Sequence, residues 1–491
     1  MVIAIKGIFA YHWKCAWNGA CTLLFKEYFT SKCNGFGFNG FDWNISVWYY
    51  TDNNRRSEGR IKSDFETNKF YKETRIMKKV LVVANSFPPM GGPGVQRSSK
   101  FVKHLRKFGY EPIVLTRDMA NVQVRDETLM QDIPEGVKIV RTKAYETEEW
   151  KGIFRIPGKV IARMMIPDGT SLWARMSRKV AVKLVKEDGI EYIYTTSAPY
   201  CAHLLGRYVK KKVPQVKWVA DFRDEWTNNP YTLDNPHNAF RTRIEKNMEK
   251  SVMIETDALV TNTPVMKENF IKNHNIKSDK FHVIPNGYDE EDFAGYEKKA
   301  VNNNQFTLVY TGALYGRRKP DTFFEALKQL IHEDKVDGNK IKVRLMGNYY
   351  KERLQKVIDS FGLTPQIEIV GYVPHDICIK EQMSCDVLVL IEGTGKGSNA
   401  FYTGKLFEYM NTGKPVLALL PEHGVAADLV RESNIGIVAD TDDVKQIKEN
   451  LLRYYNSWKE KDLRFEPNQE VIAKYERKKL TEKLAKIFDD L

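Results

Sequence analysis

The chain has 491 residues, a formal net charge of +13 and 42% hydrophobic residues. It is too long for one ordinary hydrophobic core, so we expect two or three domains, and its apolar content is ample for packing them. The positive charge favours anionic partners, which include a nucleotide, a phosphate-rich lipid surface and nucleic acid.

Cysteine usage and hydropathy indicate the cellular environment of the protein. The six cysteines form no CxxC pair and have no histidine beside them at metal-ligand spacing. We therefore expect a reduced, cytoplasmic protein. No run of eighteen uncharged apolar residues occurs, and Lys14 interrupts the best N-terminal candidate for a signal or membrane segment.

Residues 1–76 differ in character from the rest of the chain. They carry glycine-aromatic clusters, such as NGFGF at residues 34–38, and show no helical or strand period. Met77 then opens MKKVLVV, which is typical of the start of a bacterial protein. We interpret residues 1–76 as an extension outside the core fold, and an aromatic interfacial anchor is the alternative.

Residues 77–293 are predicted to form the first domain. Short apolar runs alternate there with amphipathic segments, a pattern typical of a parallel sheet wrapped by helices. Apolar residues recur at helical spacing from Phe101 to Phe108, and Gly109 ends that helix. The strands expected in this domain are residues 80–83, 112–115, 192–195, 218–220, 258–261 and 282–284.

A polar, asparagine-rich linker is predicted at residues 294–305, followed by a second domain at 306–469. The strands expected there are residues 306–310, 343–346, 367–370, 387–391, 416–419 and 436–438. Residues 470–491 predict a terminal helix that crosses back to the first domain. The predicted fold class is α/β, with two Rossmann-like, doubly wound domains facing each other across a cleft.

The glycine-rich loop after the first strand reads FPPMGGPGV at residues 87–95. Small residues are needed where backbone passes close to a ligand, so Gly91 and Gly92 are candidate binding residues. A simple tight turn is one alternative. A dinucleotide fingerprint is another, and it fits imperfectly because Arg97 occupies the position of its third glycine.

Two strand ends in the first domain carry candidate catalytic residues. Residues 219–227 read VADFRDEWT, and ligands of open parallel sheets bind beyond the carboxyl ends of strands. Asp221, Arg223 and Asp224 are the candidates there, with a structural ion-pair network as the alternative. His203, at a strand end running into a helix, is a fourth candidate, and the alternative is a histidine packed against its neighbours.

A cationic loop opens the second domain, where residues 311–320 read TGALYGRRKP. Arg317, Arg318 and Lys319 precede a helix predicted to start at Asp321. Lying opposite a phosphate-binding helix, these cations would neutralise a diphosphate. A solvated loop without function is the alternative.

The most informative segment is TGKLFEYM at residues 403–410, between two predicted strands. Free amides at a helix start and the axial dipole favour an anion beside Thr403, and Gly404 lets that anion approach closely. Lys405 adds a positive charge, and Glu408, one turn along, could accept hydrogen bonds from two vicinal hydroxyls, as on a ribose. A solvent-facing helix with a capping glutamate is the alternative.

These segments together resemble the retaining GT-B glycosyltransferases of family 4, also called glycosyl transferases group 1, over nearly all of residues 77–491. In the Glu-x7-Glu motif of that family, Glu408 matches the second glutamate, which contacts the ribose. The first falls at Ala400, and Glu392 is a candidate substitute.

The family's Gly-Arg pair and following lysine are matched in part. Lys319 matches the lysine, whereas Ala313 replaces the arginine, so the resemblance assigns the missing charge to Arg317 or Arg318. Residues 371–374 resemble the family's loop near the nucleotide base, and residues 283–289 resemble its domain-joining turn.

The resemblance implies transfer of a sugar from a nucleotide-diphosphate sugar to an acceptor hydroxyl, with retention and with domain closure about residues 289–305. Helix amides and cations would stabilise the leaving diphosphate, so we expect no metal and no cofactor. The expected acceptor is a carbohydrate or a lipid-linked sugar of the cell envelope or an exopolysaccharide.

Residues 151–186 mix basic and apolar side chains, which favours peripheral contact with anionic membrane at the inner face of the cell membrane, or else a core-facing helix. Two other functions stay open. One is a sugar-nucleotide epimerase of the same architecture, and the other is a non-enzymatic basic module for membrane or nucleic acid. We expect no nucleic acid.

Overall fold

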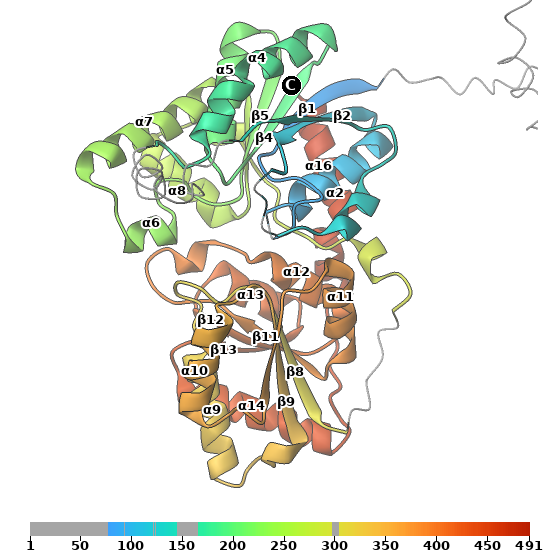
Figure 1. Ribbon diagram of the computed structural model, residues 1–491, viewed down its shortest axis with the longest axis vertical. Helices are drawn as coiled ribbons and strands as arrows, with labels where there is room; N and C mark the ends of the chain where they lie inside the picture. The colour runs from blue at the N-terminus through green and yellow to red at the C-terminus, as the bar shows by residue number, and fades with distance from the viewer. Residues whose placement is uncertain (1–76, 93, 121, 123, 145–164, 297–303) are drawn as a thin grey trace, which may run out of the picture. The chain divides into compact units, whose positions relative to one another are not determined.

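Two parallel β-sheets organise the chain, and helices cover both faces of each sheet (Figure 1). The computed structural model describes residues 77–92, 94–120, 122, 124–144, 165–296 and 304–491. These described residues belong to one compact unit. The predicted extension at 1–76 and residues 151–164 of the basic apolar segment lie outside the described residues.

The first lobe contains a seven-stranded sheet in the order β3-β2-β1-β4-β5-β6-β7, with all neighbouring pairs parallel. Strand β4 is buried along its whole length, as expected where helices cover both faces of a sheet. The strands are β1 (Lys78–Val83), β2 (Tyr110–Arg117), β3 (Lys138–Thr142), β4 (Tyr192–Ser197), β5 (Lys217–Phe222), β6 (Ala258–Thr261) and β7 (Phe281–Val283). The helices are α2 (Gln96–Leu105), α4 (Ser171–Glu187), α5 (Cys201–Lys212), α6 (Pro230–Asp234), α7 (Ala239–Glu255) and α8 (Pro264–His274), with the 3-10 turns η1 (Arg106–Phe108), η2 (Glu127–Asp132), η5 (Ser278–Lys280) and η6 (Glu290–Phe293).

The second lobe contains a six-stranded parallel sheet in the order β10-β9-β8-β11-β12-β13. Its central strands β11 and β12 are buried throughout. The strands are β8 (Phe306–Thr311), β9 (Ile341–Met346), β10 (Ile367–Gly371), β11 (Val387–Ile391), β12 (Val416–Leu420) and β13 (Gly436–Asp440). The helices are α9 (Asp321–His332), α10 (Lys351–Phe361), α11 (His375–Ser384), α12 (Gly404–Thr412), α13 (Val425–Glu432), α14 (Val444–Lys459) and α15 (Gln469–Ile472), with the 3-10 turns η7 (Gly338–Lys340), η8 (Ser398–Ala400) and η9 (Ala473–Tyr475).

The last helix, α16 (Arg477–Asp489), follows the second lobe in sequence but packs against α2 of the first (Figure 1). Its Leu480 and Leu484 are fully buried in the apolar cluster that contains Val80 and Phe101. At the start of this helix, the backbone N–H of Arg477 donates to the carbonyl of Tyr288 at 2.7 Å. The C-terminal helix is therefore part of the core of the first lobe.

The parallel strands of each sheet end at a common edge, where loops from several strands meet. Nearly all of the candidate residues lie on those loops or on the helices that follow them. Within the described residues, no helix combines the length and the apolar character that crossing a bilayer requires.

Candidate functional site

Helix α12 begins at the carboxyl edge of the second sheet, and its start is open. Thr403 is its N-cap residue and makes no cap hydrogen bond through its side chain. Gly404 is exposed, and a Cβ placed on it would meet nothing within 4 Å. The first-turn amides, which a helix leaves without partners of its own, are thus accessible to an anion.

The ammonium group of Lys405 lies beside this helix start, enclosed by the second lobe. Its Nζ donates to the hydroxyl of Tyr310 at 2.8 Å and lies 4.2 Å from the centroid of the tyrosine ring. A carboxylate oxygen of Glu392 is 3.8 Å away. Burial lowers the pKa of Lys405 to about 7, even though Glu392 acts to raise it. An anion bound here would hold the lysine in its charged form.

Glu392, at the end of β11, lies between two cations. Arg318 donates through Nε to one carboxylate oxygen at 2.5 Å, and the other oxygen faces Lys405. Burial acts to lower the pKa of the Arg318 guanidinium, but Glu392, Tyr231 and Tyr315 together raise it above its ordinary value. The structure therefore brings two of the predicted cations, Arg318 and Lys405, to one carboxylate.

The other two predicted cations lie elsewhere. Arg317 makes two hydrogen bonds to Asp234 of α6, both at 2.5 Å, and also donates to the hydroxyl of Ser398 at 2.8 Å and to the carbonyl of Lys396 at 2.9 Å. Its guanidinium thus joins the two lobes. Lys319 is exposed, and no partner for its side chain is found in the described parts of the chain.

The carboxylate of Glu408 is held by helix α11. Nε2 of His375 lies 3.1 Å from one oxygen, and the amide of Gln382 donates to the other at 3.1 Å. Burial would raise the pKa of Glu408, but these hydrogen bonds and the charge of His375 lower it. The position of the family's first glutamate is filled by Ala400, which is buried and whose carbonyl accepts a hydrogen bond from Thr263 at 2.6 Å.

The glycine-rich loop of the first lobe lies close to the loop after β10. A Cβ on Gly91 would stand 2.6 Å from the hydroxyl of Tyr372 and 2.9 Å from Val124, so no larger residue fits without movement. Gly92 has a φ of +109°, which favours glycine. Gly91 is therefore favoured by the lack of space and Gly92 by its backbone conformation, at the point where the lobes approach each other.

Asp221 is fully buried in an ion pair with Arg97. Two guanidinium nitrogens of Arg97 donate to the two carboxylate oxygens at 2.7 Å each, and the hydroxyls of Tyr194 and Thr196 donate at 2.5 Å and 3.0 Å. Burial acts to raise the pKa of Asp221, but Arg97 brings it below its ordinary value. With four hydrogen bonds and no exposed surface, this carboxylate is placed to hold β4, β5 and α2 together.

Arg223 and Asp224 follow Asp221 at the same strand end but differ in their contacts. Arg223 donates to three backbone carbonyls, those of Gly94 at 2.7 Å and of Ser197 and Ala198 at 2.5 Å each, so it fixes the glycine-rich loop against the loop after β4. Asp224 makes no side-chain hydrogen bond within the described residues. Burial raises its pKa, while Arg223 and Arg318 act in the opposite direction.

His203 lies in the first turn of α5 and is fully buried. Its Nδ1 is 2.8 Å from the hydroxyl of Thr195, and its ring packs against Phe222 with 4.3 Å between the centroids. Burial lowers its pKa to about 3, so the imidazole is neutral at physiological pH. The contacts of His203 are those of a core histidine.

One group of carboxylates in the described parts of the chain has the spacing of a metal site, and it consists of Asp132, Asp289 and Asp292. Two ammonium groups already lie among these side chains. Lys100 is 2.8 Å from Asp132 and 3.0 Å from Asp289, and Lys103 is 2.9 Å and 2.8 Å from the same two residues. The two ammonium groups therefore offset two of the three negative charges.

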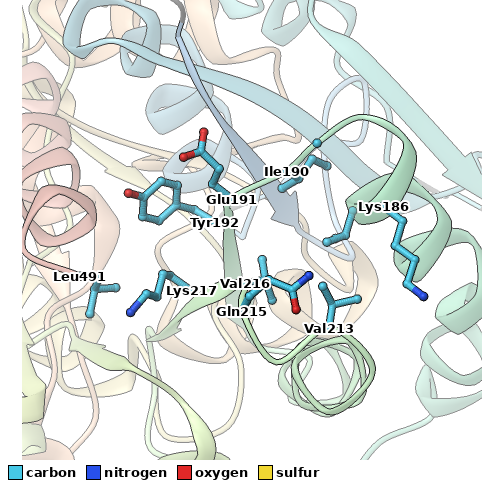
Figure 2. Close-up of a pocket in the computed structure, with 11 residues that line it drawn as sticks. Lys186, Ile190, Glu191, Tyr192, Val213, Gln215, Val216, Lys217 and Leu491 are labelled. Atoms are coloured by element: carbon cyan, nitrogen blue, oxygen red, sulfur yellow. The ribbon is translucent and has the colours of Figure 1, made fainter.

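A cavity of about 510 Å³ lies in the first lobe, at the opposite edge of the sheet (Figure 2). Its lining includes Glu191 and Tyr192 at the start of β4, Lys217 at the start of β5, and the C-terminal Leu491. Because the strands are parallel, these amino-terminal ends face away from the edge that carries the candidate residues. This cavity contains none of them.

The sequence analysis missed His375, Gln382, Tyr310 and Asp234. A signal for the first two was present, because positions seven apart on a helix share a face and His375 follows directly after the loop predicted to lie near a nucleotide base. Tyr310 and Asp234 gave no such signal. One is a strand residue, and the other lies on a five-residue helix that reaches Arg317 of the other lobe.

Two Rossmann-like lobes with parallel sheets, joined by a C-terminal helix that packs on the first lobe, define the GT-B class of proteins. Residues 99–292 match the family model described as Glycosyltransferase Family 4, and residues 292–472 match the model described as Glycosyl transferases group 1. The chain belongs to this family of glycosyltransferases and is an enzyme of that class.

Individual relatives are distant. The chain is 22% identical over 423 residues to mannosylfructose-phosphate synthase of Agrobacterium fabrum, covering 77% of this chain and 85% of that protein. It is similar to a glycosyltransferase structure from Rickettsia africae, with a TM-score of 0.58, 16% identity and coverage of 84% and 98%. It is also similar to WaaG, a glycosyltransferase involved in lipopolysaccharide biosynthesis, with a TM-score of 0.51, 14% identity and coverage of 83% and 99%.

Proposed function

We propose that this enzyme transfers a sugar from a nucleoside diphosphate sugar to a hydroxyl group of a carbohydrate or lipid-linked acceptor. The observation that carries the proposal is the pairing of Lys405 and Arg318 beside the open start of α12, with Glu408 one turn further along the same helix. Amides and cations suit a diphosphate, and a carboxylate suits ribose hydroxyls.

In the proposed reaction the bond between the anomeric carbon and the diphosphate oxygen breaks, and a bond from the acceptor oxygen to that carbon forms on the same face. The acceptor proton passes to the departing diphosphate, and the anomeric configuration is retained. Helix-start amides, Lys405 and Arg318 stabilise the charge that develops on the leaving diphosphate, without a metal or another cofactor.

We propose different roles for the polar residues of the first lobe. Asp224 accepts a hydrogen bond from a sugar or acceptor hydroxyl, since its carboxylate has no partner in the described residues and is influenced by Arg318 of the other lobe. Asp221, Arg223 and His203 act as positioning residues, because their side chains are bonded to the protein itself.

The proposal is tested by incubating the full chain with a panel of nucleoside diphosphate sugars and measuring its thermal unfolding. One or more donors should raise the midpoint, since a ligand that binds only the folded state stabilises it. NMR of the product from that donor should show the anomeric configuration of the donor, and excess chelator should leave the rate unchanged. No shift with any donor contradicts the proposal, and an inverted product or a chelator-sensitive rate contradicts the corresponding part of it.

A role in assembly of the cell envelope or an exopolysaccharide, at the cytoplasmic face of the membrane, is also proposed. It is supported by the similarity to WaaG, which is involved in lipopolysaccharide biosynthesis, and by the net positive charge. The described part of the basic apolar segment includes helix α4, which buries Trp173 and exposes Arg175 and Lys179. Co-sedimentation with anionic but not neutral liposomes is the expected result, and failure to bind either contradicts membrane contact.

A further inference from the structure

Helix α11 presents two side chains to one carboxylate. His375 begins the helix, and Gln382 lies seven residues later on the same face, so the two side chains reach the two oxygens of Glu408 at 3.1 Å each. Gln382 is fully buried, and the side chains of His375 and Glu408 are 14% and 13% exposed. Helix α11 alone thus supplies a hydrogen-bond partner for each oxygen of Glu408 and restrains its side-chain conformation.

The first turn of α11 is itself held in place. The backbone N–H of His375 donates to a carboxylate oxygen of Asp126 in the first lobe at 3.0 Å, and the hydroxyl of Tyr372 lies 3.4 Å from the same oxygen. His375 is therefore held by a hydrogen bond of its backbone as well as by one of its ring.

The charges around His375 come from several elements. Glu408 of α12 and Asp292 of η6 raise the pKa of the imidazole, while burial and Lys100 of α2 lower it, and the result is a pKa of about 9. Arg477, buried at the start of α16, also acts on Glu408. Cys378, one turn along α11, has a pKa raised to about 12 by burial and stays a neutral thiol. The pair is thus an ion pair at neutral pH.

We propose that His375 and Gln382 are positioning residues, which orient the carboxylate of Glu408 so that it accepts hydrogen bonds from both vicinal hydroxyls of a donor ribose. Each carboxylate oxygen has two acceptor positions, and α11 occupies one on each. Gln96 of α2 also acts to lower the pKa of Glu408. The inference rests on the proposed function and adds to it the two side chains that orient the ribose-binding carboxylate.

The test compares a ribonucleoside diphosphate with its 2′,3′-dideoxy form. UDP, GDP and ADP are titrated into the full chain by calorimetry, and the dideoxy form of whichever binds is titrated next. Wild type should bind the ribose form at least about tenfold more tightly, because hydrogen bonds to a charged group are lost with the hydroxyls. In His375→Ala this ratio should fall toward one, while the affinity for the dideoxy form stays unchanged.

Two further variants make the result specific. His375→Gln keeps a neutral hydrogen-bond donor at similar reach, so the ratio should be largely retained near pH 7 and should not change as the pH rises through about 9. In wild type the imidazole loses its charge over that range, and the ratio should fall only in part, because a neutral imidazole can still donate one hydrogen bond. His332→Ala, at an exposed histidine at the end of α9, is the matched control and should behave as wild type.

The outcomes separate the two proposals. A ratio that stays at the wild-type value in His375→Ala, or an equal loss of affinity for both nucleotides, overturns this inference and leaves the proposed function standing. Wild-type protein that binds none of the three nucleotides overturns the proposed function, and this inference with it.

Discussion

The carboxyl edges of the two sheets both carry charged side chains, but these side chains differ in how completely the protein itself bonds them. In the first lobe, Asp221 is bonded to Arg97, Tyr194 and Thr196, and Arg223 donates to three backbone carbonyls. Only Asp224 of this group is left without a partner in the described residues. In the second lobe, Lys405 is held by one hydrogen bond to Tyr310 and by a carboxylate 3.8 Å away. The first edge is built to be rigid, and the second can accept a ligand.

The comparison shows that a charge cluster at a strand end is not by itself a sign of chemistry. A buried ion pair needs a full set of hydrogen bonds to offset its loss of solvation, and Asp221 has that set. In a site that binds an anion, by contrast, the cationic side chains have few hydrogen-bond acceptors or carboxylates of the protein around them. The low pKa of Lys405, about 7, shows this condition at the start of α12.

The largest effect is expected for Asp221→Asn, measured as the free energy of unfolding in urea. Removing this carboxylate leaves Arg97 buried without its counter-charge, which should cost about 3–5 kcal/mol. The matched control is Asp224→Asn, which removes no hydrogen bond within the described residues and relieves a carboxylate whose pKa burial has raised. Its unfolding free energy should change by less than about 0.5 kcal/mol while its transfer rate falls. Equal losses of stability in the two variants would contradict a structural role for Asp221 that Asp224 lacks.

Much of the fold was predictable from the sequence. Each predicted strand overlaps an observed one, because both faces of a parallel sheet are buried and its strands read as continuous apolar runs. The prediction missed β3 (Lys138–Thr142). This strand lies at the edge of the sheet and reads KIVRT, in which only Ile139 and Val140 are apolar, so it lacks the longer apolar run of the other strands.

The site was predictable only in part. A helix start with its glycine and lysine is a local pattern, and the sequence indicated Thr403, Gly404 and Lys405 directly. Pairings between distant segments left no local pattern, so the sequence did not show that Arg317 meets Asp234, or that Asp221 is enclosed by Arg97 and Tyr194. The same charged residue types occur at both edges, and only the fold decides which of them are satisfied.

The second prediction concerns Glu408→Ala, which should weaken binding of the cognate nucleoside diphosphate about 100-fold, because two hydrogen bonds to a charged group are removed. Inorganic diphosphate has no ribose, so its affinity should not change. Calorimetry with both ligands, after circular dichroism has shown that the variant is folded, checks the result. An unchanged affinity for the nucleotide would show that Glu408 does not bind the ribose.

The third prediction uses the pKa of Lys405. In the free protein burial lowers this pKa to about 7, so the lysine is partly neutral at pH 7.5, and a bound diphosphate should raise the pKa again. Binding should therefore take up protons near pH 7.5, and affinity should fall as the pH rises above about 7. Titration calorimetry in buffers of different ionisation enthalpy measures the uptake. Lys405→Met should bind about tenfold more weakly, with little proton uptake. If Lys405→Met takes up as many protons as wild type, a group other than Lys405 is titrating.

The smallest effect is expected at the ion pair between Arg317 and Asp234, which joins α6 to the cationic loop. The side chains are 15% and 40% exposed and the pair is screened by solvent, so Asp234→Asn should leave the midpoint of urea unfolding close to that of wild type and change nucleotide affinity only slightly. Arg317→Met should behave in the same way, since the structure gives this guanidinium to Asp234 and Ser398. If instead Arg317→Met loses tenfold or more in nucleotide affinity while Asp234→Asn does not, Arg317 leaves its partner to bind the donor. Arg317 would then pair with Asp234 in the free protein and contact the nucleotide in the complex.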